Sequence, residues 1–249
     1  MTENLRCCLM IPVFRHMQPL IHVLEALDAQ PLPCFIVDDH NEPPLAEALA
    51  KELAGRPWIT VLRLPVHSGK GIACVEGCRQ AYAQGFTHAI FMDADGQHDS
   101  DDIPRMLALM RQHPHAMILG RPVFDVSAPA GRRFGRLLSN VWAWIETLSF
   151  QIKDSLFGYR LVPLAPFINV AANVQLGKRM DFDPDMVVRL FWEGVPVVSF
   201  DTHVSYPPGG VSNFNLWRDN VRLSWLHTRL FFGMLKRFPG LVKRHWVSV

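Results

Sequence analysis

The stretch FMDADGQHDSDD, residues 91–102, places five aspartates directly after an apolar run. The run, Ala89 to Met92, has the composition of a short strand buried on both faces. Carboxylates that follow one another so closely repel and raise one another's pKa. We therefore expect a compensating cation beside this segment.

Apolar segments alternate with segments of helical spacing along the first 120 residues. Strands are expected at 9–14, 34–37, 58–62, 88–92 and 116–119, and helices at 17–29, 45–53, 71–84 and 101–112. This alternation predicts an α/β fold with a mostly parallel central sheet and helices on both faces.

Three of the expected strands are followed directly by an aromatic ring or by carboxylates. Pro12 and Phe14 end the first strand, Asp38–Asp39 follow the second, and Asp93–Asp95 follow the fourth. In open parallel sheets, ligands bind beyond the carboxyl ends of the strands. The sequence therefore predicts that these segments converge on one ligand site.

The second half of the chain is less regular. Residues 120–136 read as a basic loop, 137–150 and 186–192 as helices, 195–200 as a strand, and 204–210 as a Pro/Gly loop before a last helical stretch that runs to Pro239. No linker rich in Gly or Ser divides the chain. We expect one domain over 1–215, with an amphipathic helical segment over 216–249 that belongs to the same domain.

Composition narrows the class of protein. The formal net charge is +2 over 249 residues, which is too mild to argue for a nucleic-acid partner. The chain begins without the pattern of a signal peptide, and no uncharged apolar run approaches the ~18–20 residues that span a bilayer. Five cysteines, an odd number without CxxC spacing, are typical of thiols in a reducing compartment. We therefore expect a cytoplasmic location.

The acidic segment offers oxygen ligands for a divalent cation. Asp95 and Gln97 carry the carboxylate and amide oxygens that suit Mg²⁺ or Mn²⁺, which also bind substrate phosphates. Asp99, Asp101 and Asp102 fit the first turn of a helix instead.

The acidic segment can also be compared with two other aspartate-rich motifs. An EF-hand fails, because His98 and Pro104 occupy the sixth and twelfth positions counted from Asp93, where Gly and Glu are needed. A phosphatase of the haloacid-dehalogenase kind would use a DxDGT motif with Asp93 as nucleophile. Gln97 stands where that motif has Thr, and this reading stays open as an alternative.

Several motifs in succession resemble those of one enzyme family. They are IPVF (11–14), VDD (37–39), HSGKGIACVEG (67–77), MDADGQHDSDDIP (92–104), GRP (120–122), RLLSN (136–140) and KDSLFGYRL (153–161). Together they resemble the family-two glycosyltransferases with the GT-A fold, in particular the subgroup of dolichol-phosphate mannose synthase-like, polyprenyl-phosphate enzymes. The likeness covers roughly residues 9 to 215.

The resemblance implies a donor site for a nucleotide-diphosphate sugar. The residues implied to bind the donor are Pro12, Phe14, Asp38, Asp39, Asp93, Asp95, Gln97, Ser212 and Asn213. Among them, Asp95 and Gln97 would hold Mg²⁺ or Mn²⁺ on the diphosphate, and Asp93 would lie near the sugar. Transfer in this family inverts the configuration of the anomeric carbon.

The resemblance also implies an acceptor site and leaves alternatives. Arg121 would bind an acceptor phosphate, with Arg136 and Ser139 near a second such position, so that Asp93, Asp95 and Arg121 act in the reaction itself. A hydroxyl acceptor would need a base instead, for which Asp154, Asp181 and Asp183 are candidates. A non-catalytic protein that binds nucleotide sugars or a membrane surface is a further alternative.

Two departures from the subgroup's pattern qualify this assignment. Pro207 and Asn213 stand in SYPPGGVSNFN (205–215) where basic residues are usual, and His16 replaces a Glu. They indicate a donor or acceptor other than those of mannose-phosphate synthesis.

The end of the chain interleaves basic and aromatic residues. The basic residues stand at 218, 222, 229, 236, 237, 243 and 244, and the aromatic residues include Trp217, Trp225, Phe231, Phe232, Phe238 and Trp246. Such a helix suits the interface of an anionic membrane. Leu223, Leu226 and Leu230 can equally pack against the sheet. We expect peripheral association with the inner-membrane surface, and a lipid-linked acceptor as the partner there.

Overall fold

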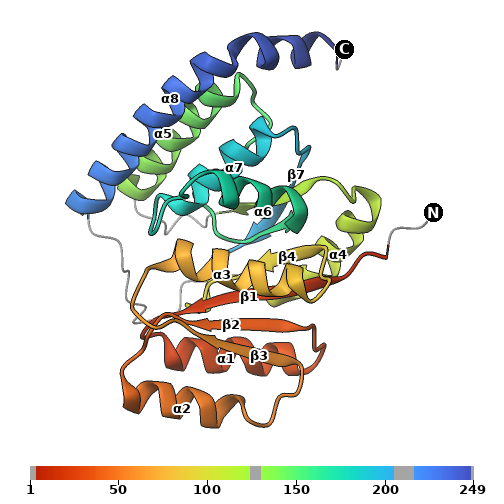
Figure 1. The fold of residues 1–249 in the computed structure, drawn as a ribbon, viewed down its shortest axis with the longest axis vertical. Coiled ribbons are helices and arrows are strands. Elements are labelled where there is room, and N and C mark those ends of the chain that lie inside the picture. Colours follow the sequence, from red (N-terminus) through yellow and green to blue (C-terminus); the bar gives the residue numbers. More distant parts are fainter. Residues whose placement is uncertain (1–3, 124–129, 205–215, 248–249) are drawn as a thin grey trace.

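The structure, a computed structural model, describes residues 4–123, 130–204 and 216–247. One sheet lies at its centre (Figure 1). Its strands are β1 (Cys7–Val13), β2 (Cys34–Asp38), β3 (Ile59–Arg63), β4 (His88–Phe91), β5 (Met117–Val123), β6 (Arg160–Pro163) and β7 (Val197–His203), in the order β3-β2-β1-β4-β6-β5-β7. Only β6 runs antiparallel to its neighbours, so the predicted mostly parallel α/β sheet is confirmed.

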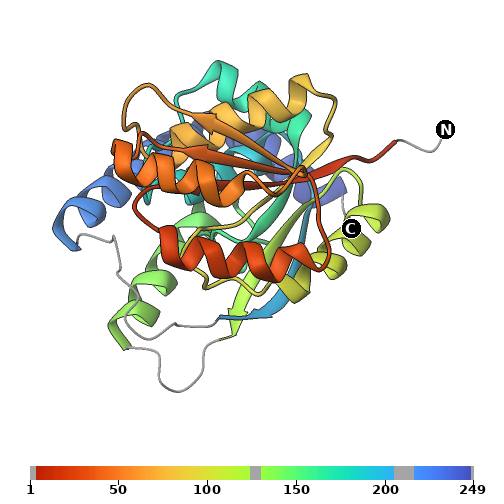
Figure 2. The same cartoon turned by 90° about the horizontal axis from the view of Figure 1, so that it is seen from below.

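Helices cover both faces of this sheet, as predicted. They are α1 (Met17–Asp28), α2 (Pro43–Leu53), α3 (Lys70–Ala83), α4 (Ile103–Gln112), α5 (Ala130–Thr147), α6 (Leu164–Asn173), α7 (Phe182–Trp192) and α8 (Leu216–Val247). The core on one face is built with α1, α2 and α4, and the core on the other with α3, α5, α6, α7 and α8. Figure 2 shows α1 and α4 on one side of the sheet and α3 and α6 on the other.

Four elements differ from the sequence-based expectation. Strand β6 and helix α6 were not predicted, because β6 is only four residues long and begins with a charged residue, Arg160. Helix α5 begins at Ala130, inside the stretch expected to be a loop, since Gly and Arg there hid its helical spacing. Helix α8 continues past Pro239 to Val247, and Arg244 anchors this last part by donating to the carbonyls of Phe191 and Trp192 at 2.8 and 2.7 Å.

The last helix packs on the rest of the chain. Leu226, Leu230 and Met234 of α8 are buried in the same core as α3 and α7. Within residues 4–123, 130–204 and 216–247, no helix combines the length and apolar character needed to cross a bilayer.

Candidate active site at the carboxyl edge of the sheet

The predicted site segments meet at one edge of the sheet. Val13 pairs with Asp38, and Met10 pairs with Phe91 three residues earlier on β1. On the other side of β4, Arg160 pairs with both Phe91 and Leu119. Asp93 and Arg121 each follow by two residues, so both lie at the same carboxyl edge as Asp38. The convergence expected from the strand ends is therefore present.

Lys70, the first residue of α3, compensates the first aspartate of the acidic segment. Its Nζ lies 2.7 Å from Asp93 Oδ1 and 3.0 Å from Asp183 Oδ2 on α7. The guanidinium of Arg160, fully buried, lies 3.3 Å from the other oxygen of Asp183. Two cations and two carboxylates thus form one compact cluster.

The charges of this cluster hold one another ionised. Burial alone would lower the pKa of Lys70, but the carboxylates of Asp183 and Asp93 outweigh it and raise that pKa above its ordinary value. Burial would raise the pKa of Asp93, yet Lys70 and His98 hold it below the ordinary value. Gly158 lets the cluster close, because a Cβ there would lie 2.7 Å from Asp93 Oδ2 and 2.9 Å from Lys70 Nζ.

Asp95 is placed differently from Asp93. Its Oδ1 accepts a hydrogen bond from the backbone N–H of Gln97 at 3.1 Å, across Gly96 in the left-handed region at φ 73°. Burial and the nearby charge of Asp93 raise the pKa of Asp95. Among the residues that the structure describes, no Lys or Arg forms an ion pair with Asp95.

The other carboxylates of the acidic segment have structural partners. Asp99 accepts a hydrogen bond from the backbone N–H of Asp101 at 3.0 Å and caps the 3-10 turn Ser100–Asp102 that leads into α4. His98, whose pKa is lowered by burial although Asp93 and Asp95 favour its charged form, accepts from the backbone N–H of Asp93 at 3.1 Å. These contacts hold the acidic loop against the sheet.

The predicted nucleotide-binding residues Pro12, Phe14, Asp38 and Asp39 lie at the ends of β1 and β2 or directly after them. The ring of Phe14 stacks on His67 with centroids 3.9 Å apart, and Pro12 is half-buried beside it on β1. Asp38 accepts from the backbone and side-chain amides of Asn41 at 2.8 and 2.7 Å. Asp39 accepts from the backbone N–H groups of residues 68 and 69 at 2.7 and 2.8 Å.

Both of these aspartates are 2% exposed, so their carboxylates shape the loop before α3. Contact of either carboxylate with a base or ribose stays a prediction.

The predicted acceptor residues lie on β5 and α5. Arg121 forms a two-pronged pair with Asp201 of β7, at 2.5 and 2.7 Å, and both side chains are about half exposed. Arg136 lies 2.6 Å from Asp154 Oδ2. Ser139 is buried beneath the surface of α5. Two other predicted donor residues, Ser212 and Asn213, lie outside the described residues.

The three aspartates named as candidate bases serve structural contacts. Asp154 accepts from the backbone N–H groups of Leu156 and Phe157 at 2.9 Å each, besides pairing with Arg136. Asp181 accepts from the backbone N–H of Arg179 at 2.9 Å, and Asp183 belongs to the Lys70 cluster.

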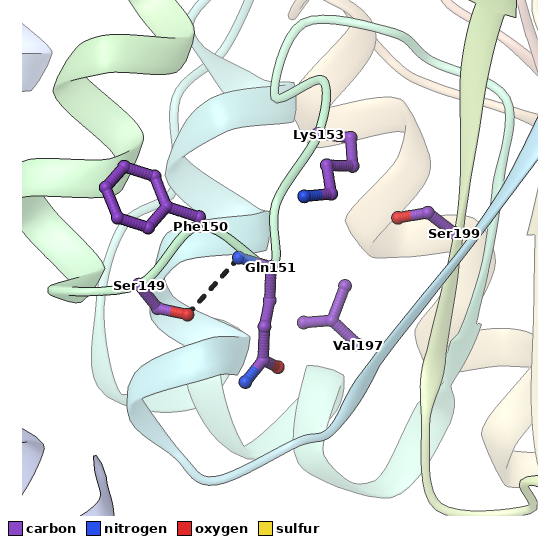
Figure 3. Close-up of a pocket in the computed structure, with 6 residues that line it drawn as sticks. All are labelled: Ser149, Phe150, Gln151, Lys153, Val197 and Ser199. Carbon is purple, nitrogen blue, oxygen red and sulfur yellow. Dashed lines mark hydrogen bonds between the residues drawn. The ribbon is translucent and has the colours of Figure 1, made fainter.

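A hollow of about 480 Å³ lies on the same face of β7 as Asp201. It is lined by Ser149, Phe150, Gln151, Lys153, Val197 and Ser199. Figure 3 shows Gln151 and Lys153 on one side and Val197 and Ser199 of β7 on the other. Ser199 precedes Asp201 by two residues, so their side chains share a face. None of the residues that line the hollow belongs to the acidic segment.

A divalent cation fits the acidic edge only if the protein and a bound substrate phosphate coordinate it together. Within the described part of the chain, no group of three or more His, Cys, Asp or Glu side chains is suited to hold a metal. Asp95 and Gln97 supply two oxygen groups, and the charge of Asp95 has no ion-pair partner there. Mg²⁺ commonly binds one or two carboxylates together with substrate phosphates. The residues present fit that mode.

Sequence reasoning assigned no role to Lys70, although it lies in the quoted motif HSGKGIACVEG. Its position as the first helical residue after Gly69, with φ at 95°, was the available signal, because a Gly at a helix start marks a close approach. Its two carboxylate partners lie 23 and 113 residues away along the chain and could not be read from spacing.

The fold and this edge define a class, the GT-A-like α/β proteins that present carboxylates at the carboxyl ends of parallel strands. Residues 8–163 match the pattern of glycosyl transferase family 2. The chain therefore belongs to glycosyl transferase family 2. This membership does not support the alternative of a dehalogenase-like phosphatase.

A curated relative and several solved structures are similar to the chain. An undecaprenyl-phosphate mannosyltransferase from Micrococcus luteus is 29% identical over 109 residues, which are 43% of this chain and 45% of that protein. The matched stretch is thus less than half the length of that relative.

S. aureus TarS 1-349 in complex with UDP-GlcNAc superposes with a TM-score of 0.62 at 12% identity, over 91% of this chain and 66% of that one. Glucosyl-3-phosphoglycerate synthase from Mycobacterium tuberculosis, in complex with Mn²⁺, UDP-glucose and phosphoglyceric acid, superposes with a TM-score of 0.61 at 11% identity, over 93% and 79%. At such identities, these two likenesses establish the fold.

Proposed function

We propose that this protein transfers a hexose from a nucleotide-diphosphate sugar to a lipid-linked phosphate, with inversion at the anomeric carbon. One observation carries the proposal: at the carboxyl edge of the sheet, Lys70 neutralises Asp93, whereas Asp95 has no ion-pair partner among the described residues. A carboxylate without an ion pair, at the same edge of the sheet as the stacked rings of Phe14 and His67, suits a cation that binds together with a diphosphate.

Each donor residue has a task that follows from its position. Phe14 and Pro12 pack against the base and ribose, and Asp38 or Asp39 hydrogen-bonds them. Asp95 and Gln97 hold Mg²⁺ or Mn²⁺, and Asp93, kept ionised by Lys70, faces the sugar. When bound, the metal ion stabilises the negative charge that develops on the leaving nucleotide diphosphate.

The acceptor approaches from the basic side of the same edge. A lipid phosphate is already an anionic nucleophile, so the side chains needed are cations that position it and not a general base. Arg121, half-exposed at the edge, is suited to this task, and Arg136 and Ser139 of α5 would contribute to it. The name of the Micrococcus luteus relative, an undecaprenyl-phosphate mannosyltransferase, supports this acceptor class.

The outer face of α8 supports a membrane surface as the place of reaction. Trp217, Trp225 and Phe232 are 80%, 63% and 59% exposed and lie at helical spacing on one face. Arg229, Lys236 and Lys243 recur every seven residues on the flank of that face and are exposed. Aromatic side chains flanked by cations favour the interface of an anionic bilayer. We propose peripheral association with the cytoplasmic face of the inner membrane.

A donor panel tests the reaction. The full chain is incubated with radiolabelled nucleotide sugars, Mn²⁺ and extracted membrane lipids, and the label that moves into lipid is measured. We expect one donor to label a phosphate-containing lipid, and Asp95→Ala to abolish the transfer. A labelled lipid without phosphate would favour the hydroxyl acceptor, and tight donor binding without any transfer or hydrolysis would favour a binding protein.

Vesicle sedimentation tests the membrane surface separately. Wild type should bind vesicles that contain anionic lipid more tightly than neutral ones, and binding should weaken with salt. Trp225→Glu should weaken binding about tenfold, since it removes the burial of one large side chain. Val61→Glu, at an exposed apolar position on β3, is the matched control and should change nothing. Equal binding by both variants would contradict the proposal.

A further inference from the structure

A buried chain of hydrogen bonds joins α8 to α5 beside the proposed acceptor site. His227 Nδ1 lies 2.8 Å from Glu146 Oε1, and His227 Nε2 lies 3.1 Å from Ser139 Oγ. The three residues are 5%, 0% and 5% exposed in the order His227, Glu146, Ser139. The second carboxylate oxygen of Glu146 has no hydrogen-bond partner among the described residues. A buried ionisable pair of this kind requires an explanation, because its desolvation is costly.

The chain continues from Ser139 toward Arg136. Ser139 Oγ lies 3.3 Å from Ser155 Oγ, and the Ser155 hydroxyl and backbone N–H both donate to Asn140 Oδ1, at 3.1 and 2.9 Å. Ser155 directly follows Asp154, whose carboxylate holds the guanidinium of Arg136. This chain of hydrogen bonds therefore ends beside the Asp154–Arg136 pair, and Arg136 is one of the two arginines proposed for the acceptor phosphate.

The direction of these bonds depends on how many protons the Glu146–His227 pair carries. Because the Ser155 hydroxyl donates to Asn140, its oxygen can only accept from Ser139. When Ser139 donates to Ser155, His227 Nε2 must donate to Ser139, and the pair then holds two protons and has no net charge. When the pair loses one proton, His227 Nε2 accepts from Ser139, the bond to Ser155 is lost, and a net negative charge stays buried.

The surrounding charges bear on the same equilibrium. Burial raises the pKa of Glu146, the charge of His227 opposes this, and Asp185 on α7 adds to it. Asp185 is itself paired with Arg189 at 2.5 Å and is influenced by Arg229 of α8. On the α5 side, Arg136 faces Asp154. The protonated, uncharged pair is thus the state in which no negative charge besides that of Asp154 offsets the positive charge of Arg136.

We propose that His227 is a positioning residue for the acceptor: together with Glu146 it holds the Ser139 hydroxyl beside Arg136, and binding of a phosphate monoester there stabilises the proton-loaded pair. This inference rests on the proposed function, since it concerns the same acceptor. It makes acceptor binding depend on the docking of α8 against α5. It also makes that binding weaker at high pH, where the buried Glu146 carboxyl, whose pKa burial raises, gives up its proton.

The test measures binding of farnesyl phosphate, a short polyprenyl phosphate, to the full chain between pH 6 and 9 by calorimetry. After correction for the ionisation of the phosphate itself, wild type should bind more weakly as the pH rises. His227→Leu should bind about tenfold more weakly across this range, because a hydrogen bond to a charged site is lost. His227→Gln and Glu146→Gln keep neutral hydrogen-bonding groups that do not titrate, so their affinities should change less with pH than that of wild type.

Controls separate positioning from folding and from the proposed function. His22→Gln alters an exposed His–Glu pair on α1, where Nδ1 lies 3.3 Å from Glu25, and should keep the wild-type pH profile. The substrate's own titration is common to all variants and cancels in the comparison. If wild type and His227→Gln share one pH profile, the inference is overturned while the acceptor class stands. If wild type binds no farnesyl phosphate at all, both are overturned.

Discussion

The acidic edge of the sheet and the outer face of α8 both concentrate charge, but they manage it in opposite ways. At the edge, Lys70, Asp93 and Asp183 are drawn together from three distant segments and lie mostly out of solvent. On α8, Arg229 and Lys236 stay in water. Removing one partner of a buried pair is costly to the fold, whereas exposed charges contribute little to it. The edge is therefore built by folding, whereas the outer face of α8 stays exposed to solvent.

The largest expected effect concerns Asp95. Asp95→Asn should lower donor hydrolysis and transfer by about 1000-fold, since it removes the charged ligand for the ion that stabilises the leaving diphosphate. Asp101→Asn, an exposed position in the same loop, is the control and should leave the rate within about twofold. The rates are measured with Mn²⁺ and each nucleotide sugar. Full activity of Asp95→Asn would exclude the metal role.

The next effect is on stability and tests the contrast between buried and exposed pairs directly. Lys70→Met leaves Asp93 and Asp183 without their shared cation and should lower the free energy of unfolding by about 3 kcal/mol. Arg79→Met, on the same helix, breaks an exposed pair with Glu76 and should cost less than about 1 kcal/mol. Urea denaturation measures both. Equal losses of unfolding free energy in the two variants would show that the buried Lys70 cluster stabilises the fold no more than an exposed pair does.

A smaller effect is expected from Gly158. Gly158→Ala would place a methyl group 2.7 Å from Asp93 Oδ2, so the Lys70–Asp93 pair must shift, and the rate should fall about tenfold. Gly55→Ala is the control, because a Cβ there meets nothing within 4 Å. Steady-state kinetics with the donor found in the panel give both rates. An unchanged rate in Gly158→Ala would mean that the geometry of this pair does not matter to the reaction.

The smallest effect is a change of stability with pH and metal. Burial and the charge of Asp93 raise the pKa of Asp95 in the folded protein, so the folded state binds this proton more tightly than the unfolded one. The free energy of unfolding should therefore fall as the pH rises from the pKa of Asp95 in the unfolded chain to its higher pKa in the folded protein. Above the folded-state pKa, the loss of stability is complete. Without metal at pH 7, Asp95→Asn should melt higher than wild type.

Adding Mn²⁺ with a nucleoside diphosphate should raise the melting temperature of wild type, because ligands that bind only the folded state stabilise it. The same addition should raise that of Asp95→Asn much less. Thermal melts of wild type and Asp95→Asn, each with and without Mn²⁺ and the nucleoside diphosphate, give four melting temperatures at each of two pH values. A wild type that melts higher than the variant without metal would contradict the assignment of an uncompensated charge.

Much of the acidic edge was predictable from the sequence, because the residue patterns that indicate it are local. Asp38 and Asp93 each follow an apolar strand directly, and parallel strands bring such positions to one edge. The acidic turn Ser100–Asp102 indicated the helix Ile103–Gln112 that follows it. Strand β6 was missed, since a four-residue strand that begins with Arg160 resembles a turn until its antiparallel neighbours are known.

The alternating architecture, the acidic strand end and the amphipathic last helix follow from the sequence alone, because each depends on the spacing of residue types along a short segment. Contacts made in the folded chain fix which aspartate is neutralised and which hydroxyl is held by a histidine. Lys70 meets Asp183 across 113 positions, and Ser139 meets His227 across 88. Charge compensation and hydrogen bonding act through space, so their partners are chosen by packing and not by order along the chain.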